Sequence, residues 1–152
     1  MAAYISLDIL TPNGRVDLRA SAADQPGKEQ GPIEIEGVLI PAALGELGVL
    51  PGHIPFLTPV VPGVVAFRYE GRDRRIAVGQ GFLEISETGA VSLLTERVAR
   101  PWEVEVDKAK AERAKIEEEI KVRAGAVDDV EVVKLKHRFD WLDAQLRAVQ
   151  AG

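Results

Sequence analysis

The two histidines, His53 and His137, are the side chains in this sequence most often associated with catalysis or metal binding. A zinc site normally needs three or four nitrogen, sulfur or oxygen ligands, and a chain with two histidines and no cysteine does not supply a convincing set. Hydrolysis with His53 as general base and Glu46 or an aspartate as its orienting acid would also need a serine in a strained turn and a second acid, and the sequence offers neither. We therefore expect neither a catalytic nor a metal site, and we interpret His53 as a histidine satisfied within a turn.

The sequence around residues 79–84, "GQGFLE", is the nearest approach to a glycine-rich phosphate-binding loop. It lacks the third glycine of that motif and is predicted to enter a strand rather than a helix. Gly79 and Gly81 instead predict a bulged strand entry with a close backbone approach. Trp102 and Trp141 are predicted to make core or docking contacts rather than to stack on a base.

Residues 45–53, "GELGVLPGH", place three glycines and one proline in a short loop whose only ionisable groups are Glu46 and His53. Proline fixes one backbone angle and the glycines permit tight turns, so the composition predicts a small and rigid loop. Such a loop could hold a fixed contact with another protein. The alternative, which the residues alone favour, is a plain β-turn that shapes the sheet.

The first two thirds of the chain have the pattern of a β-sheet protein. Short segments with period-two alternation or β-branched runs are separated by turn signals such as "PNG" and "ETG", which predicts a β-sandwich or flattened barrel. Residues 19–32 are small, polar and rich in Gly and Pro, and are predicted to form a loop. The expected strands are residues 4–10, 33–40, 63–69, 75–78, 81–85 and 91–96.

After Pro101 the pattern changes to that of two helices. The first is predicted to follow a boundary at residues 101–106 and to end at Gly125, and the second to begin after Asp128 as N-cap. The short connection makes them an antiparallel hairpin. Each helix carries one narrow apolar stripe, so the hairpin must dock on the sheet or on a partner to be stable. The apolar positions are Val106, Ala109, Ile116 and Ile120 in the first helix, and Leu135, Phe139, Leu142, Leu146 and Val149 in the second.

Composition excludes several classes of function. The net charge of −5 argues against a nucleic-acid-binding protein, and no apolar run approaches the length of a transmembrane helix. The N-terminus shows no export or organelle signal, so a cytoplasmic location is the expectation. We divide the chain into a sandwich, residues 1–103, and a helical hairpin, residues 104–152.

Three stretches resemble the epsilon subunit of F-type ATP synthases. The stretch "GELGVLPGHIPFLTPVVPGVV" is similar to that family's signature, "RRIAVGQGFLEIS" to the strand pair that follows it, and "VSLLTERVARPWEVEVDKAKAERAKIEEEI" to its entry into the hairpin. The resemblance covers nearly the whole chain, although residues 19–32 are longer than is usual in the family. It implies the same fold, a β-sandwich followed by two antiparallel helices.

The resemblance implies a noncatalytic rotor subunit in the central stalk of a proton-translocating ATP synthase, which couples rotation of the c ring to ATP synthesis. The sandwich would bind the gamma subunit and the c-subunit ring, with Glu46, Leu47 and His53 at that interface. The hairpin would be regulatory and could inhibit ATP hydrolysis by reaching the catalytic alpha and beta subunits. Its basic residues available for acidic partners are Lys134, Lys136, Arg138 and Arg147.

Some family members bind ATP at the start of the first helix through a pattern resembling [I/L]-D-x-x-R-A. The matching stretch here is "VDKAKA", in which Asp107 is kept but Lys110 replaces the arginine, and lysine lacks the planar fork of arginine. ATP is therefore expected at most as a regulatory ligand, and no other cofactor is expected.

Two further hypotheses stay open: a free-standing ligand-binding module with an ATP-sensing hairpin, and an enzyme that uses His53. As a family member, the protein would be peripheral on the cytoplasmic face of the bacterial plasma membrane, held there by protein partners.

Overall fold

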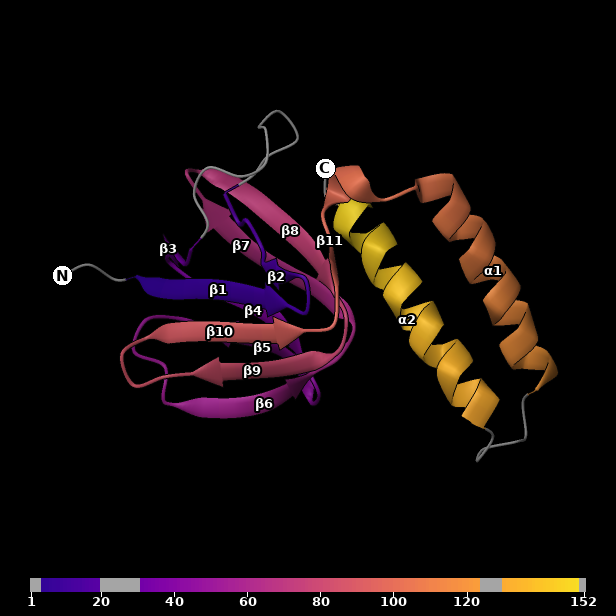
Figure 1. Cartoon of the computed structure of the whole chain (residues 1–152), viewed down its shortest axis with the longest axis horizontal. Helices are drawn as coiled ribbons and strands as arrows, with labels where there is room; N and C mark the ends of the chain where they lie inside the picture. The colour runs from indigo at the N-terminus through magenta and orange to yellow at the C-terminus, as the bar shows by residue number, and fades with distance from the viewer. Residues whose placement is uncertain (1–3, 20–30, 124–129, 151–152) are drawn as a thin grey trace.

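The computed structural model describes residues 4–19, 31–123 and 130–150, which form a β-sheet body and a two-helix hairpin beside it (Figure 1). This is the predicted fold class, and the sandwich and the hairpin are both confirmed. The described residues contain eleven strands: β1 (Ile5–Thr11), β2 (Gly14–Arg15), β3 (Ile33–Ile35), β4 (Val38–Ala42), β5 (Gly45–Val49), β6 (Phe56–Val60), β7 (Gly63–Tyr69), β8 (Arg72–Val78), β9 (Gly81–Ile85), β10 (Ala90–Thr95) and β11 (Val98–Ala99).

The strands form one continuous sheet that folds over on itself. Its order is β11-β8-β7-β4-β6-β9-β10-β1-β2, with β3 added beside β1 and β5 beside β4. Neighbours are antiparallel except for β1 and β10, which run parallel. The sheet turns its corner between β4 and β6, where a single residue pair, Ala42 with Val60, joins the two strands. The two layers that result form a flattened barrel, and the core lies between them.

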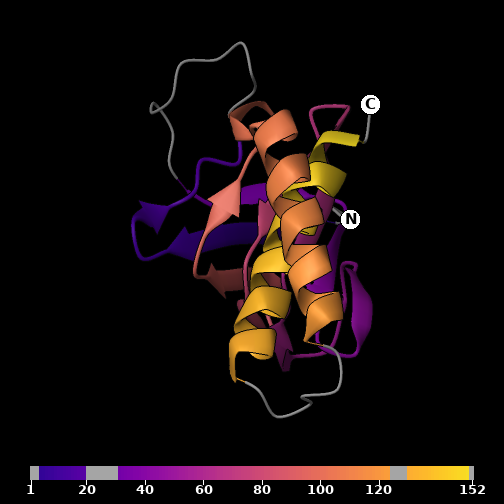
Figure 2. The ribbon, with the colours of Figure 1, turned by 90° about the vertical axis from the view of Figure 1, so that its right-hand side faces the viewer.

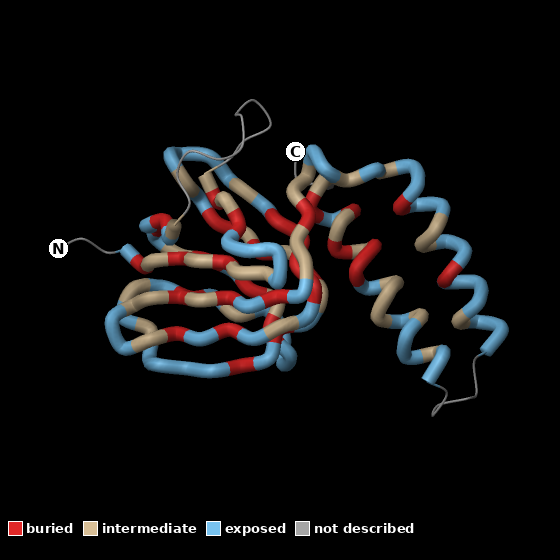
Figure 3. Tube along the Cα trace, in the orientation of Figure 1, coloured by how far each residue is buried: buried red, intermediate tan, exposed pale blue. Residues whose placement is uncertain are grey.

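The core of the sandwich is almost entirely aliphatic. Buried positions alternate with exposed ones along β9 and β10, as period-two strands require, and Figure 3 shows this alternation. Leu7, Leu83 and Leu93 are fully buried at its centre. A buried leucine contributes roughly 1.5–3 kcal/mol relative to an exposed one, so this core is the main source of stability for the sandwich.

The strands differ from the sequence prediction at several places: β2 and β11 were not predicted, and β8 begins at Arg72 rather than at residue 75. The prediction of a loop over residues 45–53 is wrong for Gly45–Val49, which is strand β5 and pairs with β4 along its whole length. The predicted strand 33–40 is divided into β3 and β4, which pair with different neighbours. Strand β6 was not predicted, because Pro59 within it argues against a strand.

A short 3-10 helix, η1 (Pro101–Glu103), links the sheet to α1 (Val106–Val122), and α2 (Val130–Gln150) returns beside α1. Leu142 and Leu146 of α2 are buried against Ala109 and Ile116 of α1. The predicted apolar stripes therefore meet between the helices. The predicted end at Gly125 and the predicted N-cap Asp128 lie outside the described residues. Neither α1 nor α2, the α-helices of the described part, is long and apolar enough to cross a membrane.

Helix α2 lies between α1 and the sheet, as the side view in Figure 2 shows, and it packs on β7 and β8. The contact uses small residues: Ala144 and Ala148 of α2 are buried against Ala77 of β8. Small side chains allow the helix to approach the sheet closely, and Trp141 is buried in the same cluster. The hairpin therefore rests on a shallow surface that is separate from the core of the sandwich.

The closest backbone approach in the sheet is at Gly81, the first residue of β9. A Cβ atom placed there would lie 1.8 Å from the carbonyl oxygen of Leu94. The predicted need for a glycine at this strand entry is thus explained by its neighbour on β10. Gly79 is also crowded, but by the side chain of Glu96 rather than by backbone.

We predict that Gly81→Ala destabilises the sandwich by about 3 kcal/mol, because the added methyl group forces β9 away from β10. Thermal and urea unfolding of the full chain would measure the change. Gly48→Ala is the matched control, since its Cβ would meet Leu39 at an ordinary 3.5 Å, and it should change stability by no more than about 0.5 kcal/mol. Equal stability of the two variants would contradict this account.

Candidate partner-binding surfaces

The turn between β4 and β5 projects an apolar side chain into solvent. Leu44 at this turn is fully exposed, and Gly45 beside it has φ 126°, a conformation that favours glycine. Glu46 is exposed on β5, and Val61 is exposed on the neighbouring β6–β7 turn. We call Leu44, Glu46 and Val61 the tip surface. Leu44 was not among the candidates selected from the sequence, because a single leucine in a turn is not a signal for a binding site.

The tip surface is held firmly by backbone hydrogen bonds. The Ala43 N–H donates to the Pro59 carbonyl at 3.1 Å, and the Val61 N–H donates to the Pro41 carbonyl at 2.9 Å. The β4–β5 ladder continues behind them. The rigidity expected of this segment therefore comes from strand pairing, whereas the sequence interpretation assigned it to Pro51 and the turns.

His53 lies at the other end of β5 from Glu46. Glu46 pairs with Pro41 near the tip, whereas Val49 pairs with Val38 and is followed by the turn that contains His53. The imidazole Nδ1 lies 2.8 Å from the Ile54 carbonyl, and the ring is 6.3 Å from that of Phe56. Leu47 is half-buried against the core. The structure does not bring these three candidate residues together at one point.

A larger apolar surface covers the outer face of β6, β9 and β10. Phe82 lies opposite Pro59 on one side and Leu94 on the other, and Leu94 lies opposite Leu10 of β1. Phe82 and Leu94 are each 56% exposed, and the nearby Leu57 is 69% exposed. We call Leu10, Leu57, Pro59, Phe82 and Leu94 the outer-face patch.

The outer-face patch has a polar border. The next row of the sheet carries Glu84, Ser92 and Asp8, and Asp8 pairs with Arg15 at 3.0 Å. An exposed apolar patch with a polar rim is typical of a protein–protein contact. A signal for it was present in the sequence, because Phe82 and Leu94 occupy the solvent-facing positions of their strands, where polar residues are usual.

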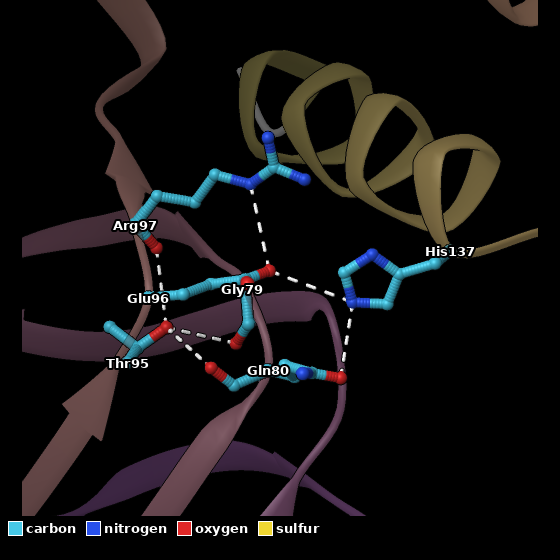
Figure 4. A network of polar contacts seen from close by, with 6 residues as sticks. All are labelled: Gly79, Gln80, Thr95, Glu96, Arg97 and His137. Atoms are coloured by element: carbon cyan, nitrogen blue, oxygen red, sulfur yellow. Dashed lines mark hydrogen bonds and ion pairs between the residues drawn. The ribbon is translucent and has the colours of Figure 1, made fainter. Parts of the chain in front are cut away.

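The hairpin and the sandwich meet in a polar network drawn in Figure 4. The His137 Nε2 of α2 lies 3.1 Å from the Gln80 side-chain oxygen and 3.6 Å from a Glu96 carboxylate oxygen. The buried Thr95 hydroxyl is 3.0 Å from the Gly79 carbonyl, to which it donates. His137 is therefore positioned in a docking contact between sheet and helix.

Arg97 is the second part of this contact. Its guanidinium lies 4.5 Å from the centre of the Trp141 ring, a distance suited to a cation–π interaction. Burial lowers the pKa of Arg97, and the neighbouring Glu96 carboxylate counteracts that effect. On the helix side, burial raises the pKa of Asp140. Trp141 thus has the docking role expected of it from the sequence.

The basic residues of α2 have different surroundings. Lys134 and Lys136 are exposed. Arg138 donates from Nε to the Glu112 carboxylate at 2.8 Å, and this hydrogen bond lowers the pKa of Glu112. Arg147 is paired with Asp143 at 2.9 Å. In the docked hairpin, the two lysines are thus more accessible to an acidic partner than the two arginines.

Asp107 and Lys110 are exposed near the start of α1, on positions other than those that face α2. Neither residue lines the cavity of about 490 Å³ at the junction of hairpin and sandwich. Among the described residues no group of three or more His, Asp or Glu side chains is arranged to hold a metal ion.

Comparison with known proteins relates this chain to one protein family. Residues 30–101 match the family model described as the ATP synthase, Delta/Epsilon chain, beta-sandwich domain. The chain is 38% identical over 88 residues to the ATP synthase epsilon chain of Citrifermentans bemidjiense, a match that spans 58% of this chain and 63% of that protein.

A longer match is found with the ATP synthase epsilon chain of Moorella thermoacetica, at 35% identity over 127 residues, 83% of this chain and 84% of that one. A chain in the cryo-EM structure of the Euglena gracilis mitochondrial ATP synthase, OSCP/F1/c-ring, has the same fold, with a TM-score of 0.70 at 22% identity over 97% of this chain and 82% of that chain. The sandwich, the hairpin and the sequence identity over most of the chain all point to the same family. The chain belongs to the family of ATP synthase epsilon chains.

Proposed function

We propose that the chain is a noncatalytic subunit of the central stalk of a proton-translocating ATP synthase, where it couples rotation of the c ring to ATP synthesis. The observation that carries the proposal is the outer-face patch, an apolar surface on a rigid sheet with no covering element among the described residues. Rotation under load requires contacts that do not slip, and a patch on paired strands meets that requirement better than a loop would.

The outer-face patch is assigned to the gamma subunit. Phe82 and Leu94 are adjacent on neighbouring strands and both are half-exposed, so together they form an anchor for a complementary apolar surface. A few residues near the centre of an interface, often large anchors, contribute most of its binding energy. The polar row of Glu84, Ser92 and Asp8 would then form the rim.

The tip surface is assigned to the c-subunit ring. Leu44 and Glu46 combine one apolar and one acidic side chain at a turn whose backbone is bonded on both sides. This arrangement suits a polar loop of the ring with a cationic group near Glu46. His53, at the opposite end of β5, is closer to the apolar residues Phe56 and Leu57 and would lie toward the gamma contact.

The hairpin is proposed to regulate ATP hydrolysis by leaving the sheet and reaching the catalytic alpha and beta subunits. Its contact with the sheet is built from alanines, Trp141 and the network around His137, and it shares no residue with the core of the sandwich. Release would therefore leave the sandwich intact. Lys134 and Lys136 are already accessible for acidic groups, whereas Arg138 would first have to leave Glu112.

Binding to these subunits would hold the protein at the cytoplasmic face of the bacterial plasma membrane without lipid contact. The alternative of a free-standing ATP-sensing module rests on Asp107 and Lys110, and ATP as a regulatory ligand remains a prediction. Both residues are exposed and neither lines the cavity of about 490 Å³, so the geometry favours the stalk subunit.

We predict that Phe82→Asp and Leu94→Asp each weaken binding to the purified gamma subunit of the same organism by about 30-fold, since each places a charge in the apolar centre of the contact. Isothermal titration calorimetry would measure the affinity. Val133→Asp is the matched control, because it makes the same kind of change at a position of α2 that is 61% exposed. Wild-type affinity in both patch variants, with the fold intact by circular dichroism, would remove the support for this assignment.

We also predict that Ala144→Glu releases the hairpin, because it buries an unpaired charge at a position with 0% exposure and costs about 3 kcal/mol of docking energy. In a Trp102→Phe background the fluorescence of Trp141 should shift to the red, and ATP hydrolysis by the assembled complex should fall. Ala114→Glu, on an exposed position of α1, should change neither quantity. A released hairpin with unchanged hydrolysis would contradict the regulatory role.

A further inference from the structure

A cavity of about 490 Å³ opens beside β8, at the end of the molecule where the chain leaves the sheet for the hairpin. Its walls come from the segment after β2, strands β7 and β8, Arg100 with η1, and the last turn of α2. None of the residues of the tip surface or the outer-face patch lines it. The cavity is therefore separate from the surfaces assigned to gamma and the ring.

One wall of this cavity is an unpaired strand edge. Strand β8 pairs with β7 from Arg72 to Val78, but on its other side it pairs with β11 only at Val78 and Ala77. Pro101 has no N–H to continue that ladder, and the chain turns into η1. Among the described residues, no strand covers the edge from Arg72 to Ile76, and a free edge is a template for another strand.

The charge along this edge is positive, although the whole chain carries −5. Arg72, Arg74, Arg75 and Arg100 line the cavity together with two acidic residues. Arg100 is engaged, since it pairs with Glu103 at 2.8 Å. The side chains of Arg72 and Arg75 are exposed and form no hydrogen bond or ion pair with any described residue, so their guanidinium groups are available to an incoming anion.

The cavity also offers apolar and aromatic surface. Leu18, Phe67 and Ile76 are buried beneath it. Trp102 is 47% exposed at its rim, with the Arg100 guanidinium 6.0 Å from its ring. A small inorganic anion would not contact this apolar and aromatic surface, whereas the side chains of a peptide would.

We propose that the free edge of β8 is a docking site for an extended acidic segment of a partner protein, which adds to the sheet as a further strand. Backbone hydrogen bonds from the edge would supply affinity, and alternate side chains would supply specificity. The arginine forks match carboxylates in geometry as well as in charge. This contact goes beyond the proposed stalk function and does not depend on it.

The test is a fluorescence-anisotropy titration of the full chain with a labelled octapeptide of alternating Asp and Leu, at low salt and without other ATP synthase subunits. The acidic peptide should bind, and the corresponding Lys–Leu peptide should not. Arg72→Ala and Arg75→Ala should each weaken binding about fivefold, the effect of losing one exposed ion pair. Arg68→Ala is the matched control: Arg68 belongs to the same β7–β8 hairpin, donates to the Gly71 carbonyl and does not line the cavity.

Two further measurements separate strand addition from simple charge attraction. A peptide N-methylated at alternate residues along its pairing edge keeps its charge but loses backbone donors, and it should bind at least tenfold more weakly. If the N-methylated peptide bound as tightly as the unmodified acidic peptide, the proposal would be overturned in favour of a small-anion site. Full displacement of the acidic peptide by pyrophosphate at equal charge would overturn it in the same way. Absence of binding, with self-association of the Arg72→Ala/Arg75→Ala chain on sedimentation, would show that the arginines only protect the edge, and would also overturn it.

Discussion

The sheet can close around its core because β9 is paired on both sides, with β6 and with β10, and that double pairing requires a glycine at position 81. The pairing directs Leu83 and Ile85 inward, where they join the core. It also directs Phe82 outward, between Pro59 and Leu94. One set of backbone hydrogen bonds therefore creates both the stability of the sandwich and the apolar surface on its outside.

The hairpin is attached in a different way. Between the helices the contact is a continuous apolar seam, but against the sheet it is a layer of alanines with Trp141 under Arg97 and His137 beside Glu96 and Gln80. Small side chains bury little area, and the polar contacts lie partly in solvent, so this interface is weaker than the core it adjoins. A weakly held element on a stable body has the energetic properties that a movable regulatory arm needs.

The molecule thus presents separate surfaces on one continuous sheet. The tip surface lies at the start of β5 and on turns that paired strands hold, the outer-face patch lies on the strands themselves, and the free edge of β8 lies near the end of α2. The strands that position these surfaces all belong to one hydrogen-bonded sheet.

The sequence by itself determined the fold class, the change from sheet to helix after Pro101 and the apolar stripes of both helices, because period and turn chemistry are local properties. It did not determine that Gly45–Val49 is a strand, since glycine-rich residues acquire that conformation only by pairing with β4. The same holds for Pro59 in β6. Nor did it determine that Glu46 and His53 lie at opposite ends of β5, that Phe82 and Leu94 meet on one face, or that the edge of β8 is left open. Those relations join residues distant along the chain, and only strand register, a property of the tertiary structure, decides which of them become neighbours.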